Sequence, residues 1–315
     1  MRALACVSGL IFVMAACSGG SDFGDDGGPD ASTADGSGTN ETDASSRDGG
    51  VESEESSASE GGDGDAGEVG DGDGEAIWTP PPTTTWHWQL TGTVSNEQSV
   101  EMVDLDLFDT PQATIDALRD QGIVVICYFS AGSHEDWRPD AMDFPTAGIG
   151  EPLDGWPGER WIDHRNLEVR SVMSARMQLA FDKSCDGVEP DNVDGYANVS
   201  GFELSAQDQL DYNLFLAYEA HGRGLSIGLK NDLEQVVELE PHFNWALNEE
   251  CQAWNECDLL DPFIAAGKAV FHVEYVDTAD AGPAAAEQVC PPALAKSFSS
   301  LVKTWELDAW GLACE

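Results

Sequence analysis

Eight short apolar runs recur between residues 86 and 315 of this chain, each about as long as one β-strand. Several of them are apolar at consecutive positions, which is typical of strands buried on both faces of a parallel sheet. The runs are WHWQLTG (86–92), VEMVDLDLF (100–108), IVVICYFSAG (123–132), DGVEPD (186–191), LSIGLKND (225–232), NWALNEE (244–250), AVFHVEY (269–275) and AWGLACE (309–315). This pattern predicts an α/β fold built on one large parallel sheet.

Helix signals occupy most of the gaps between these runs. Candidate capping residues precede the helical stretches, and glycines follow several of them. The predicted helix starts are Thr110-Pro111, Asn166, Ser205 with Asp208, Asp232 and Asp261-Pro262. Eight strands that alternate with helices predict a (β/α)8 TIM barrel. A doubly wound sheet is the alternative, but it usually has fewer strands, and no GxGxxG loop follows any of the runs.

The first 17 residues, MRALACVSGLIFVMAAC, combine one Arg, a short apolar run and small residues before Cys17. The apolar part is too short to span a bilayer, so this layout predicts a signal peptide. The MAAC ending resembles a bacterial lipobox, in which Cys17 would become the acylated first residue. Ordinary cleavage nearby, with Cys17 incidental, is the alternative. Either way we expect an exported protein, secreted or held at the bacterial surface or outer membrane by a lipid anchor alone.

Residues 18–76 differ in composition from the rest of the chain. They hold 18 Asp or Glu, one Arg and one aromatic residue among many Gly and Ser. Such a segment buries too little apolar surface to offset the entropy of ordering, so we expect a disordered acidic linker. Residues 77–315 are long enough for one barrel domain, which we expect to be a monomer. With 59 acidic and 14 basic residues, the chain is too acidic to bind nucleic acid through charge.

Six cysteines lie in the predicted barrel domain, an even number that indicates disulfides in an exported protein. Cys251 and Cys257 are close in sequence and are expected to pair. Three pairings of the other four remain open, and these four are Cys127, Cys185, Cys290 and Cys314. A metal site is the alternative reading, but CxxC and HxxxH spacings are absent from the sequence. We therefore expect neither a metal nor a cofactor.

Polar and acidic side chains follow the apolar part of strand after strand. Parallel strands of a barrel bring their C-terminal ends to one rim, where the active sites of TIM barrels lie. Charges would be costly inside a packed core, so we expect them to surround a solvent-filled mouth that binds a ligand. The residues expected to bind substrate there are Trp88, Asp104, Asp106, Tyr128, Ser130, Glu189, Asn192, Tyr196, Lys230, Asn231, Glu250, Glu274 and Tyr275.

Carboxyl groups beside aromatic rings are typical of an enzyme that cleaves glycosidic bonds. Hydrolysis of such a bond uses two carboxyl groups, one to protonate the leaving oxygen and one to attack the sugar or activate water. The loop from Ser133 to Arg165 adds Trp137, Trp156 and Trp161, whose flat apolar faces suit sugar rings. We expect Trp137 to contact the substrate. Packing within the loop is the alternative role for each of these Trp residues.

Five segments together resemble glycoside-hydrolase family 114, the endo-α-1,4-polygalactosaminidases. They are EMVDLDLFDT, VICYFSAGSHEDWRPD, CDGVEPDNVDGY, GLKND and ALNEEC, and the resemblance covers about residues 78 to 315. It implies a (β/α)8 barrel, related to the α-galactosidase group, that hydrolyses α-1,4-linked galactosamine or N-acetylgalactosamine polymers with retention of configuration. The family's catalytic pair would fall on Asp191 in the PDN segment and on Glu249 after the sixth strand.

The strand pattern supports these two assignments. Glu189 and Asp191 share one face of their strand, and Asp191 is the outermost carboxylate still held by it. Asp191 is therefore expected to be the nucleophile, with Glu189 deeper in the barrel. Glu249 and Glu250 point to opposite sides, and Glu249 is expected to be the general acid and base. Of Asp104 and Asp106, one is expected to bind substrate and the other to be solvated at the surface.

Two alternatives to this enzyme remain open. One is a surface lipoprotein that binds carbohydrate on the same barrel without cleaving it. The other is a hydrolase of another α-galactosidic polymer. The acidity of the chain would attract a partly deacetylated, cationic galactosaminan, which is the expected partner. It would equally serve to keep an exported protein soluble.

Overall fold

The structure is a computed structural model, and it describes residues 76–315. The predicted signal peptide, Cys17 and the acidic linker up to residue 75 lie outside the described residues. None of the described helices is long and apolar enough to cross a membrane.

Eight parallel strands form one curled sheet in the described part of the chain, and their order in the sheet follows the sequence. They are β1 (Trp86–Gln89), β2 (Met102–Asp106), β3 (Val124–Ser130), β7 (Gly187–Asp191), β8 (Ser226–Lys230), β9 (Trp245–Glu249), β10 (Val270–Val276) and β11 (Ser299–Thr304). Trp86 Nε1 donates to the Ser299 carbonyl oxygen at 2.9 Å and so connects the first of these strands to the last. The predicted TIM-barrel fold is confirmed.

The eighth parallel strand is not the one that the sequence predicted. The run at 309–315 contains only β12 (Leu312–Ala313), which pairs antiparallel with β11. The strand that completes the barrel is β11, whose sequence SSLVKT is polar at four of six positions yet buried throughout. Two of its polar side chains have partners outside the strand, which a sequence pattern does not reveal. Ser300 Oγ lies 2.9 Å from His272 Nδ1, and Lys303 Nζ donates to the carbonyl oxygen of Trp310.

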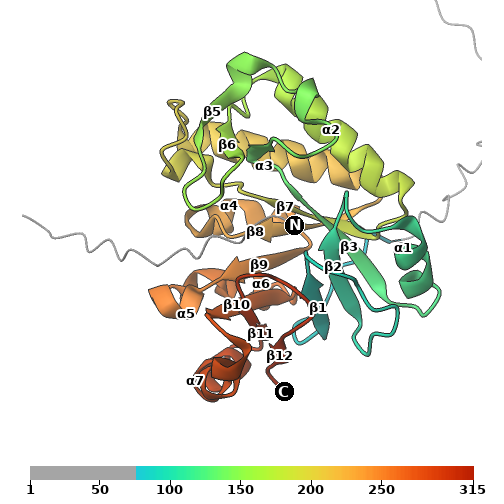
Figure 1. The fold of residues 1–315 in the computed structure, drawn as a ribbon. Coiled ribbons are helices and arrows are strands. Elements are labelled where there is room, and N and C mark those ends of the chain that lie inside the picture. Colours follow the sequence, from blue (N-terminus) through green and yellow to red (C-terminus); the bar gives the residue numbers. More distant parts are fainter. Residues whose placement is uncertain (1–75) are drawn as a thin grey trace, which may run out of the picture. The chain divides into compact units, whose positions relative to one another are not determined.

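The longer helices lie outside the curled sheet, as Figure 1 shows. The helices are α1 (Gln112–Arg119), α2 (Leu167–Asp182), α3 (Ala206–His221), α4 (Val236–Leu239), α5 (Cys251–Trp254), α6 (Asp261–Ala265) and α7 (Gly282–Ala295). The Asn166 side chain caps α2, and Ser205 with Asp208 forms the predicted capping box of α3. Asp232 differs from its prediction, because it takes a left-handed conformation (φ 44°) and makes no side-chain cap bond.

A small antiparallel sheet is inserted between β3 and α2. Its strands are β4 (Ser133–Glu135), β5 (Ile149–Pro152) and β6 (Glu159–Ile162), in the order β4-β6-β5. It begins three residues after β3 ends, so it stands at the C-terminal rim of the barrel. This sheet lies within the Trp-rich loop from Ser133 to Arg165.

Two apolar layers hold the barrel together, one inside the sheet and one between the sheet and the helices. Residues of the inner layer alternate along each strand with residues of the outer layer, as a β-strand requires. Trp245 and Leu247 belong to the inner layer, and Ala246 between them belongs to the outer one. Gly228 makes room for this packing, because a Cβ there would lie 2.2 Å from the Trp245 ring. The same alternation directs the last residues of each strand into the mouth.

Three disulfides join the six cysteines of the described residues. The predicted Cys251–Cys257 bond is present, and the pairings left open by the sequence are Cys127–Cys185 and Cys290–Cys314. Cys127–Cys185 connects β3 to the segment that leads into β7. The other two bonds lie after β9 and between α7 and the C-terminal segment.

Candidate active site

A cavity of about 810 Å³ opens at the C-terminal ends of the barrel strands. Ligand-binding clefts commonly span roughly 300–1,000 Å³, so this one has room for more than a single small group. The predicted site residues that line it are Trp88, Asp106, Tyr128, Trp137, Asp191, Asn192, Lys230, Asn231, Glu249, Glu250 and Tyr275. They come from seven of the eight parallel strands or the turns after them, and from the inserted sheet's loop.

Lys230, the last residue of β8, contacts three carboxylates at the floor of this cavity. Its Nζ lies 2.8 Å from Glu189 Oε1, 3.1 Å from Asp191 Oδ1 and 3.2 Å from Glu249 Oε2. Burial alone would lower the pKa of Lys230, but these carboxylates raise it well above its ordinary value. Lys230 is therefore a permanent cation between two carboxylates that face the cavity.

Asp191 is fixed by donors on both of its oxygens. Tyr128 OH donates to Oδ2 at 3.0 Å, and the Asn192 backbone N–H donates to Oδ1 at 2.8 Å. Asn192 adopts a positive φ of 60°, which turns the chain away as soon as β7 ends. Burial and the neighbouring Asp191 charge raise the pKa of Tyr128 well above its ordinary value, so its hydroxyl keeps the proton that it donates.

Glu249, the last residue of β9, is held by a second set of donors. Asn231 Nδ2 donates to Oε2 at 3.1 Å, and Tyr275 OH donates to Oε1. Asn231 Oδ1 also accepts the Glu249 backbone N–H at 3.0 Å, so one amide side chain orients both ends of this residue. Glu249 is half-buried, with its carboxylate in the cavity wall.

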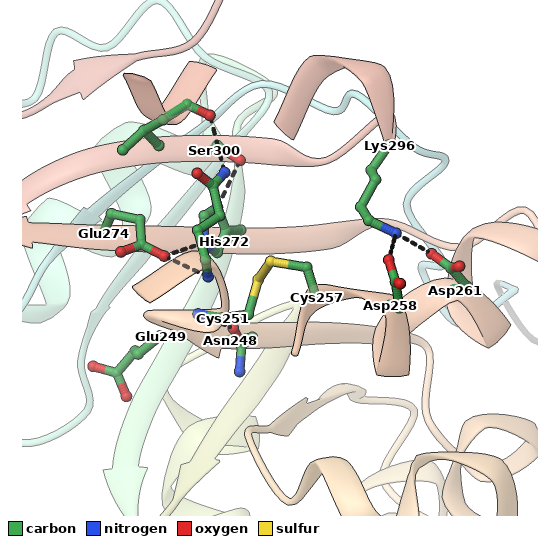
Figure 2. Close-up of a disulfide and its surroundings, with 12 residues drawn as sticks. Asn248, Glu249, Cys251, Cys257, Asp258, Asp261, His272, Glu274, Lys296 and Ser300 are labelled. Atoms are coloured by element: carbon green, nitrogen blue, oxygen red, sulfur yellow. Dashed lines mark hydrogen bonds and ion pairs between the residues drawn. A yellow bond between two sulfur atoms is a disulfide. The ribbon is translucent and has the colours of Figure 1, made fainter. Parts of the chain in front are cut away.

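The turn after Glu249 is fastened from behind, as Figure 2 shows. Asn248 Oδ1 accepts the backbone N–H of Cys251 at 3.1 Å, and Cys251 forms the disulfide with Cys257. On the neighbouring strand, Glu274 Oε1 lies 3.0 Å from His272 Nε2 and accepts the backbone N–H of Gln252. These contacts limit the positions that Glu249 can adopt.

A further pair of carboxyl groups lies beneath Lys230. Asp104 and Glu189 are fully buried, and Glu189 Oε2 and both Asp104 oxygens have no hydrogen-bond partner among the described residues. Burial and the neighbouring Glu189 charge raise the pKa of Asp104 well above its ordinary value. Glu189 is the member of the pair that contacts Lys230, through Oε1 at 2.8 Å.

Five of the predicted substrate-binding residues do not line the cavity. Asp104 and Glu189 lie one layer deeper, and Ser130 is buried beneath Asn192, whose Nδ2 donates to its Oγ. Tyr196 donates to Glu234 on the next loop, and Glu274 belongs to the network behind Glu249. A position at the end of a strand predicts that a residue lies near the rim, but it does not predict whether the side chain lines the cavity.

The prediction that either Asp104 or Asp106 is solvated at the surface is wrong. Both are buried, and Asp106 forms an ion pair with Arg138 at 2.6 Å. Arg138 also pairs with Glu135 at 2.7 Å, so these charges attach the inserted sheet to the rim of the barrel. Arg138 and Glu135 could not be predicted from the sequence, because only the folded chain brings them beside β2.

The aromatic residues that line the cavity come from separate segments of the barrel rim. Trp137, Trp156 and Trp161 come from the inserted sheet and its loops, between β3 and α2. Trp305, which follows β11, stacks on Tyr275 with ring centroids 4.1 Å apart. Trp305 and, on β6, Glu159 also line the cavity but were not predicted from the sequence. Asp191 and Glu249 line the same cavity.

A metal ion has one candidate set of ligand atoms within residues 76–315. Atoms of Cys251, Cys257 and His272 lie within 4.8 Å of one another. The two sulfurs are joined in a disulfide, so they do not offer the thiolates that a metal binds.

Comparisons with known proteins agree with this geometry. A family model described as glycoside-hydrolase family GH114 matches residues 72–315. The crystal structure of Aspergillus fumigatus Ega3 in complex with galactosamine is 40% identical, covers 76% of this chain and 98% of its own, and superposes with a TM-score of 0.71. The glycoside hydrolase domain of Pseudomonas aeruginosa PelA shares the fold at 16% identity, with 74% and 99% coverage and a TM-score of 0.58. A comparison with curated protein sequences gave no match.

Proposed function

The chain belongs to glycoside-hydrolase family GH114, and from this we propose that it is a retaining endo-hydrolase of α-1,4-linked galactosamine or N-acetylgalactosamine polymers. The 40% identity to Ega3, which was solved with galactosamine, supports the choice of sugar. Two carboxylates on a cavity wall with aromatic faces support the choice of reaction.

One observation carries the assignment of the catalytic pair. Asp191 Oδ1 and Glu249 Oε2 both contact Lys230 Nζ, at 3.1 Å and 3.2 Å. The two oxygens are therefore no farther apart than the sum of these distances, so both carboxylates can reach one glycosidic bond. Retention, in which Asp191 forms a bond to the sugar, is the outcome that the resemblance to the family implies.

In the proposed first step, the Asp191 carboxylate attacks the anomeric carbon while the Glu249 carboxyl gives its proton to the departing glycosidic oxygen. The glycosidic bond breaks, and an ester between Asp191 and the sugar forms. In the second step, water attacks the same carbon and gives its proton to Glu249, and Asp191 departs as a carboxylate. Lys230 stabilises Asp191 as an anion before the first step and after the second.

The aromatic residues support endo action. Trp137, Trp156 and Trp161 provide one set of apolar faces, and the stacked pair of Tyr275 and Trp305 provides another. Because the two sets come from separate parts of the barrel rim, sugars on both sides of the cleaved bond would find a surface. Such a site would hold an internal segment of the polymer.

Export to the cell surface completes the proposal. The three disulfides within the described residues support an oxidising compartment. We place the signal peptide at 1–17, the lipid anchor at Cys17, a tether at 18–76 and a monomeric catalytic domain at 77–315. Globomycin treatment of producing cells tests the anchor, because it blocks the signal peptidase that processes lipoproteins.

The function is tested by incubating the purified protein with α-1,4-linked polygalactosamine and sizing the products over time. Endo action gives fragments of intermediate length early in the reaction. Release of monosaccharide from the first time point would contradict it. Binding of the polymer without cleavage would favour the carbohydrate-binding alternative. Cleavage of other α-galactosidic polymers alone would assign the enzyme to a different substrate.

A further inference from the structure

Glu159, on β6, differs from the other buried carboxyl groups of the cavity wall. Asp106 and Glu135 also line the cavity and are buried, but each forms an ion pair with Arg138. Glu159 is 8% exposed, and within residues 76–315 it forms no ion pair. Its carboxylate accepts a hydrogen bond from Ser133 Oγ to Oε2 at 2.7 Å. A buried carboxylate without a cation is costly.

Glu159 lines the cavity together with tryptophans of the inserted sheet and its loops. Glu159 and Trp161 are two residues apart on β6, so their side chains leave the same face of the strand. Both line the cavity, together with Trp137, whose ring is packed so closely on Gly158 that a Cβ there would lie 2.8 Å from it. A carboxylate beside Trp faces is an arrangement that attracts an alkylammonium group.

The charge state of Glu159 depends on what occupies the cavity. Burial, together with the charges of Glu135 and Asp191, raises the pKa of Glu159 to about 7, although the bond from Ser133 and the charge of Arg138 lower it. Near neutral pH the empty site therefore contains a mixture of acid and carboxylate. A cation bound beside Glu159 would shift this mixture to the carboxylate and release a proton.

We propose that Glu159 recognises the free amine of the substrate, by pairing with the ammonium group of a galactosamine ring that rests on the Trp137 and Trp161 wall. This inference rests on the proposed function and adds the residue that determines the acetylation preference. An N-acetyl group in the same place carries no charge, so it would leave the buried carboxylate without a counter-ion. The enzyme would therefore prefer deacetylated segments of the polymer.

The kinetic test compares deacetylated and N-acetylated α-1,4-galactosamine oligosaccharides. Glu159→Gln is expected to lower kcat/KM at least about tenfold on the deacetylated substrate and to change it less than about twofold on the acetylated one. The matched control is Glu151→Gln, which removes an exposed carboxylate from β5 of the same small sheet and should leave both values unchanged. An equal loss on both substrates, or no loss, would overturn the proposal.

A binding test separates this inference from the proposed function, because it requires no turnover. Calorimetry on Glu249→Gln at pH 7, in two buffers of different ionisation enthalpy, counts the protons released when the deacetylated oligosaccharide binds. We expect release of a fraction of a proton, its disappearance in Glu249→Gln/Glu159→Gln, and at least about tenfold weaker binding there. Unchanged proton release in the double variant, or no binding of the deacetylated ligand by Glu249→Gln, would overturn the proposal.

The remaining outcomes are also decisive. If the parent protein binds the deacetylated ligand through Glu159 but cleaves neither substrate, the proposed hydrolase fails and the amine recognition stands. If Glu159→Gln does not fold, Glu159→Asp takes its place in the test, because it keeps the charge on a side chain that is one methylene shorter. That variant should retain the preference for the deacetylated ligand with weaker binding, and loss of the preference despite the retained charge would contradict the proposal.

Discussion

Lys230 Nζ lies 3.1 Å from Asp191 Oδ1, and this ion pair sits at the floor of the barrel mouth. The same ammonium group contacts Glu189 below it and Glu249 beside it. Lys230 therefore reduces the repulsion among three carboxylates that would otherwise be close together in a site largely shielded from water. The ion pair links the stability of the mouth to the geometry of the proposed reaction.

Lys230→Met should lower the free energy of unfolding by about 3 kcal/mol, because it leaves buried carboxylates without their cation. Urea unfolding measures this loss. Lys296→Met is the matched control, since Lys296 pairs with Asp258 and Asp261, whose side chains are 90% and 60% exposed. Its loss should stay below about 1 kcal/mol. Similar losses of unfolding free energy in both variants would show that the buried Lys230 ion pairs stabilise the protein no more than exposed ones do.

Asp104→Asn should keep the fold, because Asn supplies a permanent N–H donor to Glu189 in nearly the same volume. Its effect on stability should depend on pH. The pKa of Asp104 is raised well above 3.8 in the folded protein, so folding retains a proton that the unfolded chain loses. The stabilising contribution of this group is full below about pH 4 and declines as pH rises toward the folded pKa.

Asp104→Asn removes this titration, so the variant should gain stability relative to the parent as pH rises from about 4. The gain has a limit of roughly 1.4 kcal/mol per pH unit for one proton. Urea unfolding of both proteins at pH 4, 6 and 8 provides the measurement. Parallel stability curves would mean that Asp104 does not hold the proton.

The Cys127–Cys185 and Cys251–Cys257 disulfides should differ in how much each contributes to the free energy of unfolding. Cys127–Cys185 spans 58 residues and Cys251–Cys257 spans 6. On the chain-entropy estimate, removing the first as a double Ala variant costs about 4 kcal/mol and removing the second about 2 kcal/mol. Denaturant unfolding checks the order. A larger loss from Cys251→Ala/Cys257→Ala would show that its role in fixing the turn after Glu249 exceeds its effect on the unfolded chain.

Salt should slow the attack on a cationic polymer. The full chain carries a formal net charge of −45, so its field would attract a deacetylated galactosaminan. Raising the ionic strength from low salt to about 0.15 M should lower kcat/KM on this substrate several-fold, because charges are then screened beyond about 8 Å. Initial rates on deacetylated and acetylated polymer give the comparison. If the deacetylated rate does not respond to salt, the acidity serves only solubility.

The period of the apolar pattern made much of the barrel predictable. Where a run is apolar at consecutive positions, as in VVICYF of β3, few other structures can bury it. β11 was missed because its buried polar side chains Ser300 and Lys303 have hydrogen-bond partners outside the strand, in His272 and Trp310. A polar side chain can lie in a core when such partners exist, and one sequence does not reveal them.

The sequence predicted which residues lie near the rim of the barrel, but it did not predict how deep each side chain lies. Asp191, Lys230 and Glu249 were selected because each ends a strand, and the structure brings them together. Asp104 lies two residues before the end of β2, on the same face of the strand as Asp106. It is therefore deeper in the barrel than Asp106 and does not line the cavity. Glu159 lies in an insertion, where strand order gives no information about which side of the rim it reaches.

The central claim is that Asp191 and Glu249 cleave the bond between them, and the initial rate of polygalactosamine cleavage by single variants tests it most directly. Asp191→Asn and Glu249→Gln should each lose at least about 100-fold in kcat with the fold intact by circular dichroism. Asp182→Asn, at the exposed end of α2, should cleave like the parent. Parental rates in Asp191→Asn or Glu249→Gln would contradict the claim.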